Sequence, residues 1–129
     1  MLSDDELIEK AREALNPRSL SPSCGVGTVA CALISEEDEI FVGVCIDTGS
    51  SMGYCAEANA IGTMITQGES RIKTIVAVHY KGSIFPPCGR CREFIFQINN
   101  ANRDTRVILG SDKVVTIADL LPYHEPEDA

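Results

Sequence analysis

The chain has 129 residues, of which 44% are hydrophobic, so we expect a single domain spanning residues 1–129 around one core. Its formal net charge of −8 argues against a nucleic-acid partner, which would need a basic face, and favours a small molecule. No apolar stretch approaches the length of a membrane span and the first residues are acidic, so we expect a cytoplasmic protein with no membrane partner.

The N-terminal half predicts one helix followed by an antiparallel hairpin. The helix begins at a candidate capping box made by Ser3 and Glu6, and Pro17 prevents its continuation. An acidic turn then joins two strand-like stretches, and so short a connection requires antiparallel pairing. In chain order we expect a helix to residue 15, a loop over 18–23, a strand over 26–34, the turn over 35–39 and a strand over 40–46.

The rest of the chain alternates helices and strands. In chain order we expect a Gly/Ser-rich loop over 47–54, a helix over 55–67, a strand over 72–81, a loop over 82–87, a helix over 88–99, strands over 105–109 and from 114, and a short helix over 117–121. Such alternation favours parallel strands with right-handed crossovers. We therefore predict an α/β fold with a mixed five-stranded sheet.

Two short motifs, Cys55-Ala56-Glu57 and Pro87-Cys88-Gly89-Arg90-Cys91, carry the candidate chemistry. Each follows a loop and opens a predicted helix, where ligand sites of α/β folds lie. Three thiolates bind Zn²⁺ and leave its fourth position for water or substrate. Glu57 is not a ligand and is well placed to move a water proton. A Glu two residues after the first ligand, followed by Pro-Cys-x-x-Cys, is typical of zinc-dependent nucleobase deaminases.

The alternative for these motifs is a closed, structural zinc site, which needs a fourth protein ligand. His79 lies in a predicted strand and His124 in the tail, so neither has ligand spacing. One of the remaining thiols could supply the fourth ligand instead, and otherwise each is interpreted as a small buried hydrophobic side chain: Cys24, Cys31 and Cys45. A closed site would leave Glu57 without a role, so we favour the open, catalytic site.

Three thiolates give the zinc site a net charge of −1, which makes bound water less acidic. A cation near the thiolates would offset this charge, and Arg90, between two ligands, is the first candidate. Arg92 is the second. The alternative for both is a solvated surface arginine.

These motifs resemble the small cytidine deaminase family, which includes blasticidin-S deaminases. The likeness extends to Phe41-Val42-Gly43-Val44 and to Asp119-Leu120-Leu121-Pro122-Tyr123. The resemblance implies a three-layer α/β/α sandwich, a Cys₃ zinc site, a nucleoside-like substrate and a homotetramer, with a dimer as the alternative, whose sites lie at subunit contacts. It also implies a set of substrate contacts: Cys45, Asp47, Ala56, Pro87 and Tyr123.

Several of these positions depart from the family. Cytidine deaminases usually carry Asn-x-Glu where this chain has Cys45-Ile46-Asp47, although strand alternation keeps Cys45 and Asp47 on one face. A family Phe is replaced near Cys24, and the usual Arg after Cys-Ala-Glu is Ala58. The chain instead has Arg90 inside Cys-x-x-Cys, and in this position of the arginine it resembles the blasticidin-S deaminases.

The family implies that Tyr123 covers a neighbouring subunit's site, and an aromatic anchor for the tail is the alternative. We predict a zinc-dependent hydrolase that deaminates cytidine, deoxycytidine or a related aminated heterocycle. The alternatives are a blasticidin-S-type antibiotic deaminase and a non-catalytic zinc- or nucleoside-binding module.

Overall fold

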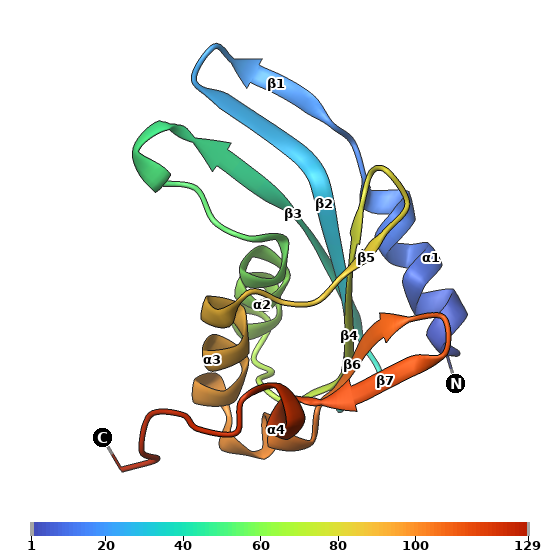
Figure 1. Ribbon diagram of the computed structural model, residues 1–129, viewed down its shortest axis with the longest axis vertical. Coiled ribbons are helices and arrows are strands. Elements are labelled where there is room, and N and C mark those ends of the chain that lie inside the picture. The colour runs from blue at the N-terminus through green and yellow to red at the C-terminus, as the bar shows by residue number, and fades with distance from the viewer. Residues whose placement is uncertain (1, 129) are drawn as a thin grey trace.

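Helices cover both faces of a twisted sheet in the computed structural model, which describes residues 2–128 (Figure 1). The elements are α1 (Asp4–Ala14), β1 (Arg18–Ser21), β2 (Cys24–Ser35), β3 (Ile40–Thr48), η1 (Gly49–Ser51), α2 (Ala56–Thr66), β4 (Ile72–His79), β5 (Ile84–Phe85), α3 (Gly89–Ile98), η2 (Asn100–Asp104), β6 (Arg106–Gly110), β7 (Lys113–Thr116) and α4 (Ile117–Leu120). The labels η1 and η2 denote 3₁₀ turns. The three-layer α/β/α arrangement confirms the expected fold class.

The sheet is mixed, as expected, but it has seven strands rather than five. Its main path is β1-β2-β4-β6-β7, with β3 beside β2 and β5 beside β4. Strands β4 and β6 pair in parallel. All five expected strands form, and β1 and β5 lie in segments predicted to be loops. Neither strand could be predicted, because neither shows an apolar pattern in the sequence. Strand β1 is exposed along its length, and β5 has only two residues.

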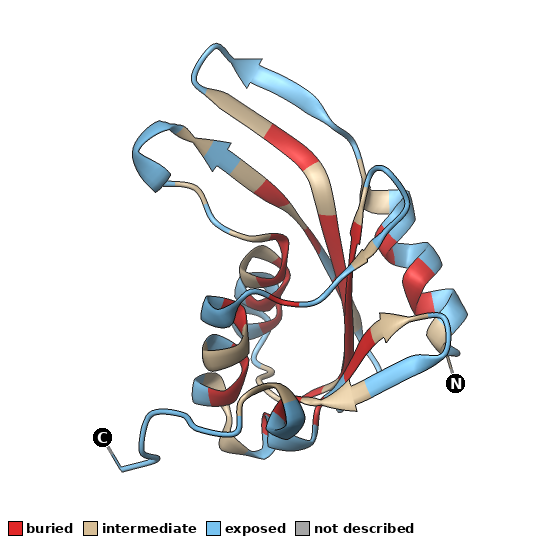
Figure 2. Cartoon of the chain, viewed as in Figure 1, coloured by how far each residue is buried: buried red, intermediate tan, exposed pale blue. Residues whose placement is uncertain are grey.

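Two apolar clusters hold the layers together. One lies between α1 and the sheet and includes Leu7, Ala32 and Val76. The other lies between the opposite face and helices α2 and α3, and it includes Ile61 and Phe96. Figure 2 shows the buried residues concentrated along the central strands and the inward sides of the helices. Within residues 2–128, no helix is both long enough and apolar enough to cross a membrane.

Candidate active site

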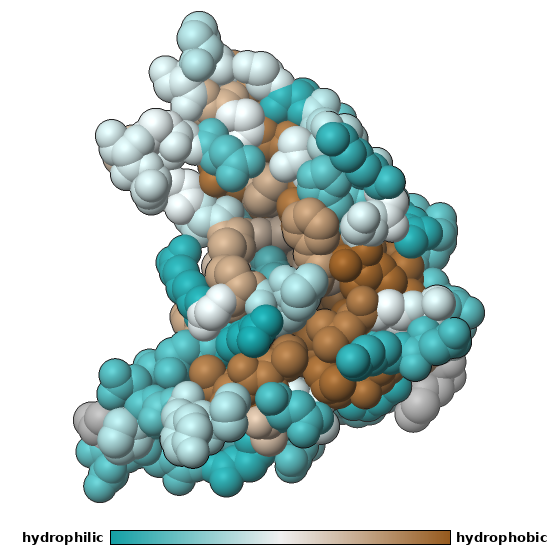
Figure 3. All heavy atoms as spheres, viewed as in Figure 1, coloured by the Kyte–Doolittle hydropathy of each residue, from teal (hydrophilic) through white to brown (hydrophobic). Residues whose placement is uncertain are grey.

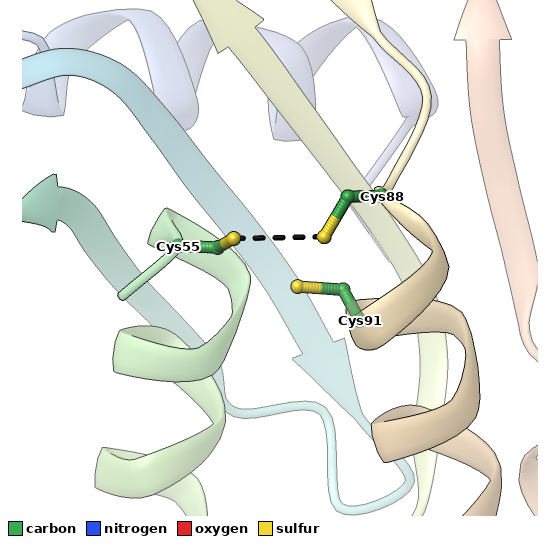
Figure 4. A group of neighbouring side chains, drawn as sticks. All are labelled: Cys55, Cys88 and Cys91. Atoms are coloured by element: carbon green, nitrogen blue, oxygen red, sulfur yellow. Dashed lines mark hydrogen bonds between the residues drawn. The ribbon is translucent and has the colours of Figure 1, made fainter. Parts of the chain in front are cut away.

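Three thiols meet where helices α2 and α3 begin. Cys55 is the N-cap of α2, Cys88 is the N-cap of α3, and Cys91 lies in the first turn of α3. Their sulfur atoms all lie within 4.8 Å of one another. Figure 4 shows Cys55 pointing from α2 toward Cys88 and Cys91 on α3, and the Cys55 and Cys88 sulfurs are 3.6 Å apart.

This spacing fits a tetrahedral zinc ion. Ligand sulfurs at the usual Zn–S distance of about 2.3 Å lie roughly 3.8 Å apart in a tetrahedron. No fourth His, Cys, Asp or Glu joins the cluster among the described residues. The ring of His79 packs on Phe85 and that of His124 on Phe96, so both imidazoles lie against aromatic side chains instead. The geometry therefore matches three protein ligands rather than a closed site.

The pKa values of the three thiols also indicate that their ionised forms need a cation nearby. Burial raises the pKa of Cys91, and the charge of Glu57 adds to this effect. Burial also raises the pKa of Cys55. For Cys88, burial opposes ionisation, but a hydrogen bond with the Cys91 backbone and the two neighbouring thiols bring its pKa below the usual value. Three thiolates so close together are stabilised only when a positive ion neutralises them, which Zn²⁺ does.

Glu57 lies in the first turn of α2 and is buried. Burial raises the pKa of its carboxyl group, although a hydrogen bond with its own backbone opposes the shift. The charge of Glu57 in turn contributes to the raised pKa values of Cys55 and Cys91. The carboxyl group thus occupies a buried position beside the thiols, where a proton can be held as well as released.

A cavity of about 650 Å³ opens beside the thiols. Its walls come from β2, β3, the loop before α2, the first turn of α2, β4, β5 and the start of α3, and they include Cys55, Glu57 and Cys88. In the space-filling view the molecule is indented between the β2–β3 part and the helical part (Figure 3). The volume of the cavity falls within the range of small-molecule binding sites.

Cys45 and Asp47 line this cavity on one face of β3. The Cys45 thiol lies 3.5 Å from an Asp47 carboxylate oxygen, to which it donates, and it accepts from the backbone N–H of Val29 at 3.4 Å. The Thr28 hydroxyl lies 3.2 Å from the same sulfur. The predicted alternation along this strand is therefore confirmed, and the thiol belongs to a small polar group.

The other predicted substrate contacts differ in position. Ala56 lines the cavity, whereas Pro87 is buried and does not. Tyr123 lies in the C-terminal tail with 90% of its surface exposed, away from the cavity of its own chain. Sequence reasoning missed Thr28, Tyr54 and Phe85 as lining residues. The available signals were two aromatic residues close to the motifs, Tyr54 directly before Cys55 and Phe85 three positions before Cys88.

The two arginines of the second motif have different surroundings. Arg90 is exposed and lines the cavity. The Arg92 guanidinium instead donates from Nε to the Pro87 carbonyl at 2.9 Å and from Nη1 to the Leu120 carbonyl at 3.3 Å. Arg92 therefore ties the segment before Cys88 to α4, and its contacts are with carbonyl oxygens rather than with the thiols.

Comparison with known proteins agrees with this geometry. Residues 1–110 match the family model described as the cytidine and deoxycytidylate deaminase zinc-binding region. The chain is similar to a cytidine deaminase of Sporosarcina psychrophila, with 31% identity over 118 residues that cover 88% of this chain and 82% of the relative. It is also similar to a blasticidin-S deaminase of Bacillus cereus, with 34% identity over 101 residues that cover 71% and 70%.

A solved structure shares the fold. The crystal structure of cytidine deaminase from Mycobacterium tuberculosis matches with a TM-score of 0.81 and 20% identity, covering 98% of this chain and 99% of that one. At 20% identity, the match shows a shared fold only.

Proposed function

The chain belongs to the cytidine and deoxycytidylate deaminase zinc-binding family, whose members are zinc-dependent hydrolytic deaminases, and from this premise we propose that it deaminates a free cytosine-type nucleoside. The observation that carries the proposal is the cluster of Cys55, Cys88 and Cys91 beside buried Glu57 at one cavity. The products are the corresponding oxo compound and ammonia.

The three cysteines would hold the zinc ion through their sulfurs. When bound, Zn²⁺ supplies the Lewis acidity that brings the pKa of a water molecule down to about 7. The N-termini of α2 and α3 favour the ionised thiols, because helix N-termini stabilise negative charge.

Glu57 would serve as the proton carrier. Its carboxylate takes a proton from the attacking water and delivers it to the ring nitrogen next to the amino-bearing carbon. A C–O bond forms at that carbon, the C–N bond breaks, and Glu57 passes the second water proton to the departing amine. Because burial raises the pKa of this carboxyl group, Glu57 can hold the proton between these steps.

Substrate recognition would involve Cys45, Asp47 and Ala56, which share the cavity with Glu57. We propose that Arg90 partly neutralises the thiolates. A homotetramer and a cytoplasmic location stay predictions, as does a role for Pro87 and Tyr123 in a site.

Replacing Glu57 with Gln tests the reaction. The amide has nearly the same shape but cannot accept the water proton, so kcat should fall at least about 100-fold while zinc remains bound. Absorbance assays with cytidine, deoxycytidine, deoxycytidine monophosphate and blasticidin S give the rates, and metal analysis gives the zinc content. Glu9→Gln, on the exposed side of α1, is the matched control. Normal turnover by zinc-loaded Glu57→Gln would rule out the assigned role.

A blasticidin-S-type activity is the second candidate. Two observations favour it: the similarity to the Bacillus cereus enzyme and the presence of Arg90 in the cavity wall. The same set of substrates distinguishes the two activities by their kcat/KM values. If a zinc-loaded sample binds nucleosides but deaminates none of these compounds, the chain is a binding module.

A further inference from the structure

An aromatic pair forms one wall of the cavity. Phe85, the second residue of β5, lines the cavity together with Glu57 and Cys88. Its ring stacks on the imidazole of His79, with ring centroids 4.9 Å apart and planes inclined by 20°. His79 is the last residue of β4, and its ring also packs against Tyr80 at 4.6 Å. Neither His79 nor Phe85 has a role in the chemistry described above.

The hairpin between β4 and β5 holds this pair in place. Phe85 is the register partner of Ala77, and the backbone N–H of His79 donates to the Ser83 carbonyl at 2.8 Å. The His79 ring is oriented by its Nδ1, which accepts from the Lys81 backbone N–H at 3.2 Å. Gly82 makes the turn with a φ of +103°, which favours glycine. The support behind Phe85 is therefore fixed by backbone geometry.

Phe85 lines the cavity and keeps part of its surface uncovered. His79 covers part of the ring, and 40% of the Phe85 residue surface remains exposed. The other apolar side chains in the lining are aliphatic or proline: Val29, Ile46, Ala56, Ala77 and Pro86. Among the described residues that line the cavity, the aromatic side chains are Tyr54 and Phe85. Cys24 is not among these lining residues.

Phe85 is also linked to the reacting end of the cavity. It precedes Cys88 by three residues, and Arg92 fixes the intervening segment through the Pro87 carbonyl. A flat ring packed on Phe85 would thus be positioned by the same segment that presents the Cys88 thiol. Stacking of two aromatic rings contributes about 0.5–1.5 kcal/mol beyond the burial of their surface.

We propose that Phe85 is the specificity-determining residue on which the planar ring of the substrate packs, and that His79 is a positioning residue that supports it from behind. The proposal rests on the proposed deaminase function, because it assumes that an aminated aromatic ring enters this cavity. It assigns ring recognition to β5 and to a stacked pair within one chain.

Binding of cytidine to the zinc-loaded Glu57→Gln protein, measured by calorimetry, tests the proposal without turnover. In this background Phe85→Leu should raise Kd about 3- to 10-fold, since the apolar volume is largely kept but the aromatic face is lost. Phe85→Tyr should stay within about 2-fold because it keeps the ring. His79→Leu should also raise Kd, but by less than Phe85→Leu does. His79→Phe should return Kd to the parent value.

Phe94→Leu is the matched control, because Phe94 is an exposed α3 residue outside the cavity lining. Equal cytidine affinities of the parent and of Phe85→Leu, with zinc content and melting temperature unchanged, would overturn the proposal. So would an equal loss in Phe94→Leu. If the wild-type chain deaminates no cytosine compound and Glu57→Gln binds none, the proposed function fails along with the inference. If the chain deaminates cytidine and Phe85→Leu changes neither the rate nor the affinity, the inference is refuted while the proposed function stands.

Discussion

Arg90 is the one basic side chain among the described residues that line the cavity, where it accompanies the carboxylates of Asp47 and Glu57. The site therefore has a strong excess of negative groups once the thiols are ionised. A guanidinium near thiolates lowers the electron density that they donate, and it also reduces the repulsion between the site and an attacking oxygen. At the scale of single residues, Arg90 is therefore the cation whose removal should lower the rate while all three ligands stay in place.

We expect Arg90→Ala to lower kcat about 10- to 100-fold while the zinc content stays the same, which is the range seen when groups around a metal's ligands are changed. Arg90→Lys should recover part of the rate because it keeps the charge. The measurements are kcat across pH and metal analysis of the purified protein. Arg18→Ala, on the exposed strand β1, serves as the control. Wild-type rates across the whole pH range would contradict the role.

At the scale of elements, helix α2 sits directly on strand β3. A Cβ atom added to Gly43 would lie 2.5 Å from the Ala60 nitrogen and 2.8 Å from the Ala56 carbonyl oxygen. The Asn59 side chain donates to the Val44 carbonyl at 3.1 Å. The helix turn that carries Glu57 is thus fixed against the strand that carries Cys45 and Asp47, so the proton carrier and the polar wall move together.

Gly43→Ala should force this contact apart, because both colliding groups are backbone. We expect a loss of about 1–3 kcal/mol in the free energy of unfolding, as for other overpacked sites, together with a lower kcat. Urea denaturation of the zinc-loaded protein measures the first effect and the absorbance assay measures the second. Gly25→Ala in β2 is the control, since its Cβ would meet only the Arg18 carbonyl at 3.9 Å. Similar stabilities for the two variants would show that the close approach is unimportant.

The parts of the fold and site that could be predicted from the sequence are those that depend on neighbouring residues. The capping box at Ser3 and Glu6 is confirmed by hydrogen bonds of 3.0 and 3.1 Å, because capping depends only on neighbouring residues. The thiol cluster was predictable for a similar reason, since Cys-x-x-Cys spacing and helix starts are local. The contacts of Arg92 were not, because its partner Leu120 lies 28 residues away. The stack of Phe85 on His79 likewise depends on the hairpin of β5, which has no sequence pattern of its own.

At the scale of the whole molecule, the described part of the C-terminal tail, up to residue 128, lies outside the lining of its own cavity. The His124 ring packs on Phe96 of α3, and Arg103 pairs with Glu127. These contacts hold the tail against the helical side while Tyr123 remains 90% exposed. An aromatic side chain so exposed is suited to cover a site on a second copy, as the predicted homotetramer requires.

Hybrid oligomers test whether Tyr123 acts on a neighbouring subunit. Tyr123→Ala and Glu57→Gln should each have low activity alone. In a co-expressed mixture, Glu57→Gln subunits still carry Tyr123 and can complete the sites of Tyr123→Ala subunits, which still carry Glu57. We therefore expect the mixture to be several times more active than either variant, with sedimentation showing one tetrameric species. Additive activities in a tetramer, or a monomer in sedimentation, would show that each chain works without its neighbour's tyrosine, since the tail cannot then complete a second site.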